Sequence, residues 1–246
     1  MSDIIAYKLD GNIVDTQSIN GRENAAEPIY YGNSPDALNV IRHSCAHLMA
    51  QAIKELYPQA KFFVGPNVED GFYYDFKVDE ANSKLSDEDL AAIEAKMKEL
   101  AEAKLDIVKA SSTKAFMSDK FKDDELKQEV LKRISEGEVS SYKQGNFEDL
   151  CRGPHLPNTK FLKFFKLTRV AGAYLGGDET REMINRIYGT AFADKESLKE
   201  HIRIIEEAKK RDHRKLGVEM KLFTFDEEVG GGLPIWLPNG GRLRSK

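Results

Sequence analysis

The sequence is poor in cysteine, histidine and tryptophan, and it lacks a long hydrophobic run. Its 246 residues include two cysteines, five histidines and one tryptophan. Two cysteines exclude a disulfide framework and are typical of a reducing cytosol. No apolar run approaches the ~20 residues of a membrane helix. The opening Met-Ser-Asp-Ile-Ile also lacks the basic and apolar regions of a secretory signal. We therefore expect a cytoplasmic protein without membrane contact.

An excess of positive charge is also absent. Lys and Arg number 37 against 41 Asp and Glu, which gives a formal net charge of −4. This balance argues against a globally basic nucleic-acid binder, although it is compatible with a local basic patch. The chain does have a hydrophobic fraction of 41%, with 13 Phe and 9 Tyr. That composition argues against disorder and predicts one or two domains with a substantial core.

Helical and strand-like patterns follow one another along the chain. Ser34 and Pro35 are helix-start signals, Pro58 is a stop signal, and Ser86 begins a second capped helix. The predicted elements are a helix over 35–57, strands over 61–64 and 72–76, a helix over 87–104, a strand over 105–108, a helix near 123–134 and short strands between 138 and 175. The fold class predicted is α+β, with an antiparallel sheet packed against long helices.

The two ends of the chain differ from its middle. Residues 1–34 contain only a hairpin signal, with strands over 4–9 and 13–14, and we expect a short N-terminal remnant. Residues 194–217 are highly charged and predict a single linker helix. Residues 218–246 are rich in Gly and read as the beginning of a further domain.

The few histidines and cysteines gather in two motifs. His43 and His47 are four residues apart on the first helix, so both imidazoles share one helical face. Cys151 and His155 have the same spacing, but the intervening Gly-Pro requires a tight turn. Three imidazoles and one thiol suit a tetrahedral zinc site, catalytic or purely structural, and equally a metal-free site that moves protons. Cys45 lies on the opposite helical face and is predicted to be a buried small hydrophobe.

Longer motifs around these residues resemble the editing domain of bacterial threonyl-tRNA synthetases, from about residue 36 to residue 246. The motifs are His43-Ser-Cys-Ala-His47, Gly71-Phe-Tyr-Tyr-Asp75, Asp149-Leu-Cys-Arg-Gly-Pro-His155, Ala171-Gly-Ala-Tyr174, Arg186-Ile-Tyr-Gly-Thr190, Lys210-Arg-Asp-His-Arg-Lys-Leu-Gly217, Phe225-Asp-Glu-Glu228 and Gly232-Leu-Pro-Ile-Trp236. Their order along the chain is that of the family, which makes the resemblance far more specific than either short motif.

The resemblance implies a division into domains. Residues 35–193 correspond to the editing domain, of the threonyl/alanyl-tRNA synthetase second additional domain type. Residues 194–217 correspond to the linker helix and 218–246 to the start of the aminoacylation domain. The family's ubiquitin-like N-terminal domain has no full counterpart here. We expect a synthetase fragment without the catalytic and anticodon-binding domains, and therefore without ligase activity, since ATP, Mg²⁺ and the threonine-binding Zn²⁺ belong to the missing part.

The implied activity is hydrolysis of the ester of mischarged seryl-tRNA(Thr). Serine lacks one methyl group of threonine, and one methyl is worth only ~1–3 kcal/mol of discrimination, so a second, hydrolytic site is needed. The resemblance implies that His43, His47 and His155 position water and ribose, and that Cys151 lines the serine pocket or assists proton transfer. The cleft would be formed by the helix over 35–57, the strand over 72–76 and the turn over 149–155.

Further residues are selected by the resemblance alone. Asp149 would orient an imidazole or bind the serine amino group, Lys127 aligns with a lysine of the family's editing site, and Tyr74 would contact the terminal adenosine or the substrate. By residue type and position alone, Tyr74 is more often a core residue, Lys127 a solvated one and Asp149 a turn residue.

The implied partner is the acceptor end of tRNA(Thr). Basic residues including Arg152, Lys160 and Lys163 surround the Cys151–His155 turn, with Phe161, Phe164 and Phe165 between them. Cations and aromatic faces of this kind suit a single-stranded RNA end, although the same pattern describes core phenylalanines below solvated lysines. Full-length members of the family are homodimers, and a monomer is an open alternative for the fragment.

The role of metal separates three hypotheses. The threonyl type of editing domain is generally read as working without an essential metal, so no cofactor is expected, and any bound zinc would sit at His43, His47, Cys151 and His155. The first alternative is a freestanding zinc-dependent aminoacyl-tRNA deacylase. The second is a non-catalytic, zinc-stapled tRNA-binding module.

Overall fold

The computed structural model describes residues 3–19, 21–135, 137–226, 230 and 232–245. Helices and antiparallel strand pairs are mixed along the chain, which confirms the α+β class. Within the described part, no helix is both long enough and apolar enough to cross a membrane. The chain divides into two compact units, with the boundary between Leu198 and Lys199.

The helices are α1 (Pro35–Leu56), α2 (Asp87–Glu102), α3 (Lys114–Lys120), α4 (Glu125–Arg133), α5 (Lys195–Lys210), α6 (His213–Glu219) and α7 (Pro238–Arg244). The strands are β1 (Ile4–Leu9), β2 (Asn12–Asp15), β3 (Glu27–Tyr30), β4 (Lys61–Phe62), β5 (Asn67–Val68), β6 (Gly71–Lys77), β7 (Ile107–Thr113), β8 (Glu138–Gln144), β9 (Phe147–Leu150), β10 (Phe164–Tyr174), β11 (Met183–Phe192), β12 (Phe223–Phe225) and β13 (Pro234–Trp236).

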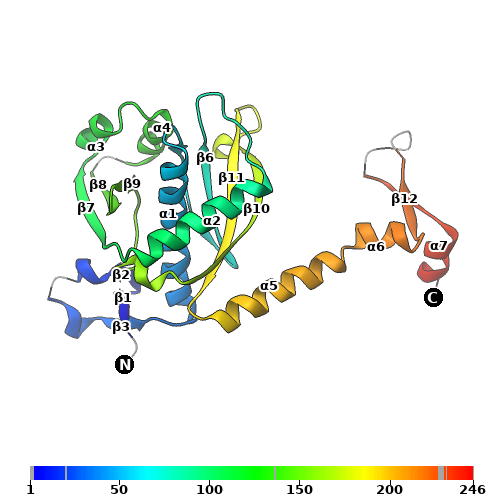
Figure 1. The fold of residues 1–246 in the computed structure, drawn as a ribbon, viewed down its shortest axis with the longest axis horizontal. Helices are drawn as coiled ribbons and strands as arrows, with labels where there is room; N and C mark the ends of the chain where they lie inside the picture. The colour runs from blue at the N-terminus through cyan, green and yellow to red at the C-terminus, as the bar shows by residue number, and fades with distance from the viewer. Residues whose placement is uncertain (1–2, 20, 136, 227–229, 231, 246) are drawn as a thin grey trace. The chain divides into compact units, whose positions relative to one another are not determined.

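The largest sheet has the order β10-β11-β6-β4, with β5 also paired to β6. Helix α1 packs against β6 and β11, and α2 packs against β10 and α1. On the far side of α1 from this sheet lies a three-stranded sheet of order β7-β8-β9 (Figure 1). The main core, which includes Met49, Ile53, Phe72, Phe76 and Ile187, fills the space around α1.

The central position of α1 follows from its sequence. The side chain of Ser34 accepts a hydrogen bond from the amide of Ala37, and Pro35 occupies the first turn, so the predicted start is confirmed. Most residues of the helix are buried, on more than one face. A helix between two sheets needs apolar or small residues around most of its circumference. His47 is one of the few polar residues held in this interior.

The N-terminal segment is more integrated than the predicted remnant. Strands β1 and β2 form the predicted hairpin, and β3 adds a third strand that the sequence analysis missed. A proline within β3, Pro28, weakens any strand prediction there, although an edge strand tolerates it. Ile5 and Ile29 are buried in the same core as α1. Strands β1 and β3 therefore help to form the first unit.

The single helix predicted over 194–217 is wrong, because α5 ends at Lys210 and α6 begins at His213. Asp212 lies between them with ψ 114°, and its side chain accepts a hydrogen bond from the amide of Arg214. Aspartate caps a helix start by satisfying these free amides, and it thereby competes with continuation of the preceding helix.

The second unit also contains the β12–β13 pair and α7. Within the motif that begins at Phe225, Glu227 and Glu228 lie outside the described residues. The assignment of 218–246 to the start of a further domain stays a prediction.

Candidate active site

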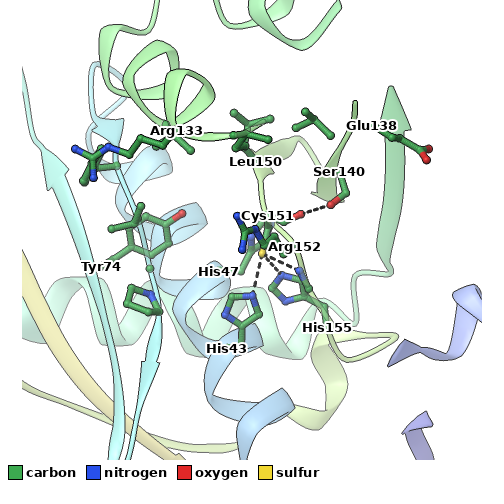
Figure 2. A pocket seen from close by; sticks show the side chains of 18 residues that line it. His43, His47, Tyr74, Arg133, Glu138, Ser140, Leu150, Cys151, Arg152 and His155 are labelled. Atoms are coloured by element: carbon green, nitrogen blue, oxygen red, sulfur yellow. Dashed lines mark hydrogen bonds between the residues drawn. The ribbon is translucent and has the colours of Figure 1, made fainter. Parts of the chain in front are cut away.

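One cavity of about 520 Å³ brings together the three segments that were predicted to form a cleft. Helix α1 contributes His43 and His47, β6 contributes Tyr74, and the segment after β9 contributes Cys151 and His155 (Figure 2). The remaining walls come from the β4–β5 loop, the end of α4 and β8. The volume lies within the range of small-ligand pockets.

Three side chains form a close cluster on one side of the cavity. Cys151 Sγ lies 2.9 Å from His43 Nε2 and 3.2 Å from His155 Nε2, as the dashed lines of Figure 2 show. The rings of His43 and His155 stack with centroids 4.5 Å apart, and His47 meets the His155 ring edge-on at 5.0 Å. The two short motifs therefore make one site.

The turn between Cys151 and His155 depends on a glycine. Gly153 has φ +71°, a conformation that favours glycine, and a Cβ atom there would lie 2.0 Å from the hydroxyl oxygen of Tyr142. The Gly153 amide donates to Cys151 Sγ over 3.3 Å, which holds the thiol toward the imidazoles. The segment from Cys151 to His155 is not helical, as the intervening Gly-Pro predicted.

Ser44 ties this turn to α1. Its hydroxyl donates to the carbonyl of Val40 over 2.8 Å and accepts the amide of Leu156, also over 2.8 Å. His155 Nδ1 lies 3.2 Å from the same oxygen. The imidazole of His155 is thus fixed from both ends, by Ser44 at Nδ1 and by Cys151 at Nε2.

Burial keeps the cluster uncharged at neutral pH. Desolvation lowers the pKa of His43 and of His47 to about 4 in each case, and it lowers the pKa of His155 well below its usual value. Desolvation likewise raises the pKa of the Cys151 thiol to about 12. At pH 7 the site therefore presents neutral imidazoles, which can accept protons, and a protonated thiol, which is a poor nucleophile.

This arrangement predicts loss of stability in acid. The pKa of His47 is about 4 in the folded chain and ~6.5 in the unfolded chain. As pH falls, the unfolded chain takes up the proton first. Above pH ~6.5, protonation of His47 therefore does not reduce the free energy of unfolding. As pH falls from ~6.5 to ~4, it lowers that free energy by about 3 kcal/mol in total. Urea unfolding between pH 7 and 4.5 measures this slope.

The His47→Gln variant should reduce that pH slope, because glutamine does not titrate. The matched control is His213→Ala, because His213 is 83% exposed and does not line the cavity. Equal slopes for His47→Gln and the parent chain would contradict the assignment of acid sensitivity to this imidazole.

A buried ion pair supports the opposite wall. Lys127 Nζ lies 2.5 Å from Asp149 Oδ1, and both side chains are only 2% exposed. The hydroxyl of Tyr74 donates to Asp149 Oδ2, and the Leu150 amide donates to Oδ1. Tyr74 lines the cavity, whereas Lys127 and Asp149 lie behind it. Lys127 is thus not the solvated residue that its charged helix favours, because Asp124 caps α4 and α4 turns Lys127 inward.

Two buried imidazole nitrogens, His43 Nδ1 and His47 Nε2, make no hydrogen bond of normal geometry among the described residues, although the Gly65 backbone interacts with the His43 imidazole. An unpaired buried polar atom costs free energy unless water or a ligand satisfies it. Both residues line the cavity. These atoms are therefore sites at which a water molecule or a polar ligand would be held.

The predicted basic residues separate into two places. Arg152 lines the cavity beside the histidines. Lys160 and Lys163 instead line a second hollow, next to Tyr31. Phe161 and Phe165 are buried in the main core, as the alternative of core phenylalanines expects, and both also line this second hollow. The reason is that η3 (Thr159–Phe161) packs against α1 and α2, which turns Phe161 inward.

A metal would have three ligands here rather than the four predicted. The donor atoms of His43, Cys151 and His155 lie within 4.8 Å of one another, and His47 is not in the group. Two imidazoles and a thiol with an open fourth position are a donor set that zinc accepts. The two Sγ to Nε2 distances, 2.9 and 3.2 Å, are shorter than the ~3.5 Å edge of a tetrahedron with zinc's usual bond lengths. The donor types fit zinc, while the spacing is that of hydrogen bonds.

Sequence reasoning missed several residues that line the cavity. Arg133 at the end of α4 lies over the ring of Phe63, 4.9 Å from its centroid, and Ser140 of β8 donates to the carbonyl of Cys151 (Figure 2). Neither belongs to a short motif, so only the folded arrangement reveals them.

Comparison with known proteins agrees with the motifs. A family model described as "Threonyl and Alanyl tRNA synthetase second additional domain" matches residues 139–188. The chain is 85% identical over 246 residues to the threonine–tRNA ligase of Campylobacter concisus and 83% identical to that of Campylobacter curvus. The predicted resemblance to the threonyl-tRNA synthetases is confirmed.

These matches cover the whole chain but only 41% of each of those two relatives. A threonine–tRNA ligase of Campylobacter jejuni is 70% identical over 244 residues, which is 99% of this chain and 40% of the relative. The segment matched by the family model contains Asp149, Cys151 and His155. The part of the cavity contributed by α1 lies outside that segment and is matched by the relatives.

Proposed function

We propose that the cavity hydrolyses the ester of seryl-tRNA(Thr), an editing reaction that removes serine from tRNA for threonine. The observation that carries this proposal is the convergence of His43, His47, Cys151 and His155 on one cavity with two unpaired imidazole nitrogens. Neutral imidazoles positioned around a water molecule are suited to ester hydrolysis. The similarity to threonine–tRNA ligases supports tRNA(Thr) as the carrier of the ester.

The reaction needs one water molecule and two proton transfers. The water oxygen attacks the ester carbonyl while an imidazole of His43 or His47 accepts its proton. The bond between the carbonyl carbon and the ribose oxygen then breaks, and the ribose oxygen takes a proton as serine leaves. Cys151, as a protonated thiol, holds the His43 and His155 rings rather than attacking the ester.

Substrate binding is assigned to the opposite wall and the mouth. Tyr74 would contact the terminal adenosine or the serine, with its hydroxyl held by Asp149 and Asp149 held by Lys127. Arg152 would pair with a phosphate of the acceptor end. Lys160 and Lys163 lie in a separate hollow, so any contribution from them would be to more distant parts of the tRNA.

The test compares two substrates in the presence and absence of a chelator. The chain is expected to hydrolyse seryl-tRNA(Thr) about 10–200-fold faster than threonyl-tRNA(Thr), since one methyl group separates them. A chelator is expected to leave the rate unchanged. Release of radiolabelled serine or threonine from purified charged tRNA measures both rates.

Two other outcomes would contradict the proposal. Hydrolysis that the chelator abolishes and added zinc restores would favour a zinc-dependent deacylase at His43, Cys151 and His155. Binding of tRNA without hydrolysis of either ester would favour a non-catalytic tRNA-binding module.

A further inference from the structure

The carboxylate of Asp15, at the end of β2, lies against the Cys151–His155 turn. Its Oδ1 accepts the amide of His155 over 2.7 Å, and its Oδ2 accepts the hydroxyl of Tyr142 over 2.7 Å. Asp15 is 3% exposed, and it lies 140 residues before His155 in the sequence. A buried carboxylate with donors on both oxygens is held in a defined geometry.

The two donors occupy the points that fix the turn. The Tyr142 hydroxyl lies where a side chain at position 153 would be, so it packs directly against the backbone between Cys151 and His155. The ring of Tyr142 lies 4.4 Å from the His155 ring. Asp15 therefore holds the backbone of His155 directly and its ring through Tyr142.

The surrounding contacts keep Asp15 in place. Gln17, two residues later, donates to the carbonyl of Ile107 over 2.5 Å and accepts the amide of Lys109, which joins the N-terminal segment to β7. Lys109 Nζ lies 3.7 Å from Asp15 Oδ2, and Ser18 donates to that oxygen over 3.2 Å. These contacts join the N-terminal segment to β7, and the side chains of the histidine cluster take no part in them.

We propose that Asp15 is a positioning residue of the hydrolytic site, and that the β1–β2 pair is thereby part of that site. The proposal rests on the hydrolysis proposed above. Asp15 does not line the cavity and acts through His155 and Tyr142. Displacement of a catalytic side chain by about 1 Å can cost about 10²-fold in rate.

The first test is kinetic. The Asp15→Ala variant removes both acceptors and is expected to lower kcat for seryl-tRNA(Thr) about 10–100-fold, with KM changed by less than about 3-fold. The Asp15→Asn variant can still accept the His155 amide and can donate to the Tyr142 oxygen, so it should stay within about 3-fold of the parent chain. The matched control is Asp36→Ala, because Asp36 forms an exposed ion pair with Lys8 of β1.

The second test needs no activity, so it separates failure of this proposal from failure of the proposed function. Iodoacetamide should alkylate Cys151 at least ~10-fold faster in Asp15→Ala than in the parent chain, because a loosened turn exposes the thiol to the reagent. Asp15→Asn and Asp36→Ala should not change the rate. Cys45 is fully buried on α1 and reports general unfolding. Peptide mass spectrometry distinguishes the two cysteines.

An unchanged Cys151 rate in Asp15→Ala, or a rate that rises only together with that of Cys45, would overturn the proposal. If Asp15→Ala does not fold, Tyr142→Phe replaces it. Loss of that hydroxyl alone should accelerate Cys151 labelling about 3-fold with Cys45 still protected, and no acceleration would overturn the proposal equally.

Discussion

The Lys127→Met variant is expected to lose about 3–5 kcal/mol of unfolding free energy. Methionine retains the apolar length of lysine but removes the charge that lies 2.5 Å from Asp149 Oδ1. Among the described residues, the buried carboxylate would keep the Tyr74 hydroxyl and the Leu150 amide as its donors. Urea unfolding followed by far-UV circular dichroism measures the loss, which is a large share of the stability of an ordinary domain.

A neighbouring ion pair provides the control for this variant. Lys120 Nζ also lies 2.5 Å from a carboxylate oxygen, that of Glu148, the residue before Asp149. Because the Lys120 and Glu148 side chains are 36% and 18% exposed, Lys120→Met should cost no more than about 1 kcal/mol. Similar losses of unfolding free energy in Lys127→Met and Lys120→Met would show that burial does not make the Lys127 ion pair more important for stability, and would contradict the prediction.

The second large effect concerns catalysis. The His43→Ala variant should slow hydrolysis of seryl-tRNA(Thr) by about 10²–10⁴-fold, the usual worth of a positioned acid–base group. His43 both contacts Cys151 and lines the cavity, and its Nδ1 makes no hydrogen bond of normal geometry among the described residues. Single-turnover release of serine from the charged tRNA separates this loss of chemistry from any loss of binding.

The control for His43→Ala is His213→Ala, because His213 is exposed and belongs to the second unit. It should hydrolyse the ester at the parent rate. A His43→Ala chain that keeps its secondary structure and loses less than about 3-fold in rate would remove His43 from the mechanism and leave His47 as the base to examine.

Local signals in the sequence predicted the helices that frame the site. Ser34, Pro35 and Pro58 set the limits of α1, and the Ser86 capping box set the start of α2. Helix caps depend on neighbours within one turn, which is why a sequence alone reveals them. The spacing of His43 and His47 likewise predicted that both imidazoles lie on one face of α1. The Gly-Pro between Cys151 and His155 predicted that this segment is not helical.

Long-range features were not predictable in this way. The burial of Lys127 depends on where Asp149 lies, and the role of Asp15 depends on contacts with a turn 140 residues away. Lys160 was grouped with Arg152 by sequence, yet it lines a second hollow, where Phe161 beside it is buried in the core. Register and packing between distant segments decide these outcomes, and no local pattern encodes them.

The order of strands in the largest sheet has a consequence for biosynthesis. β11 lies between β10 and β6, and it is the last of the strands of this sheet along the chain (Figure 1). Until residue 192 has left the ribosome, β6 and β10 each expose an unpaired edge, and α1 lacks part of the surface on which it packs. Long-range pairing of this kind is slow, and open edges invite association with other chains. Nascent chains that end before β11 should therefore be the ones that need chaperone protection.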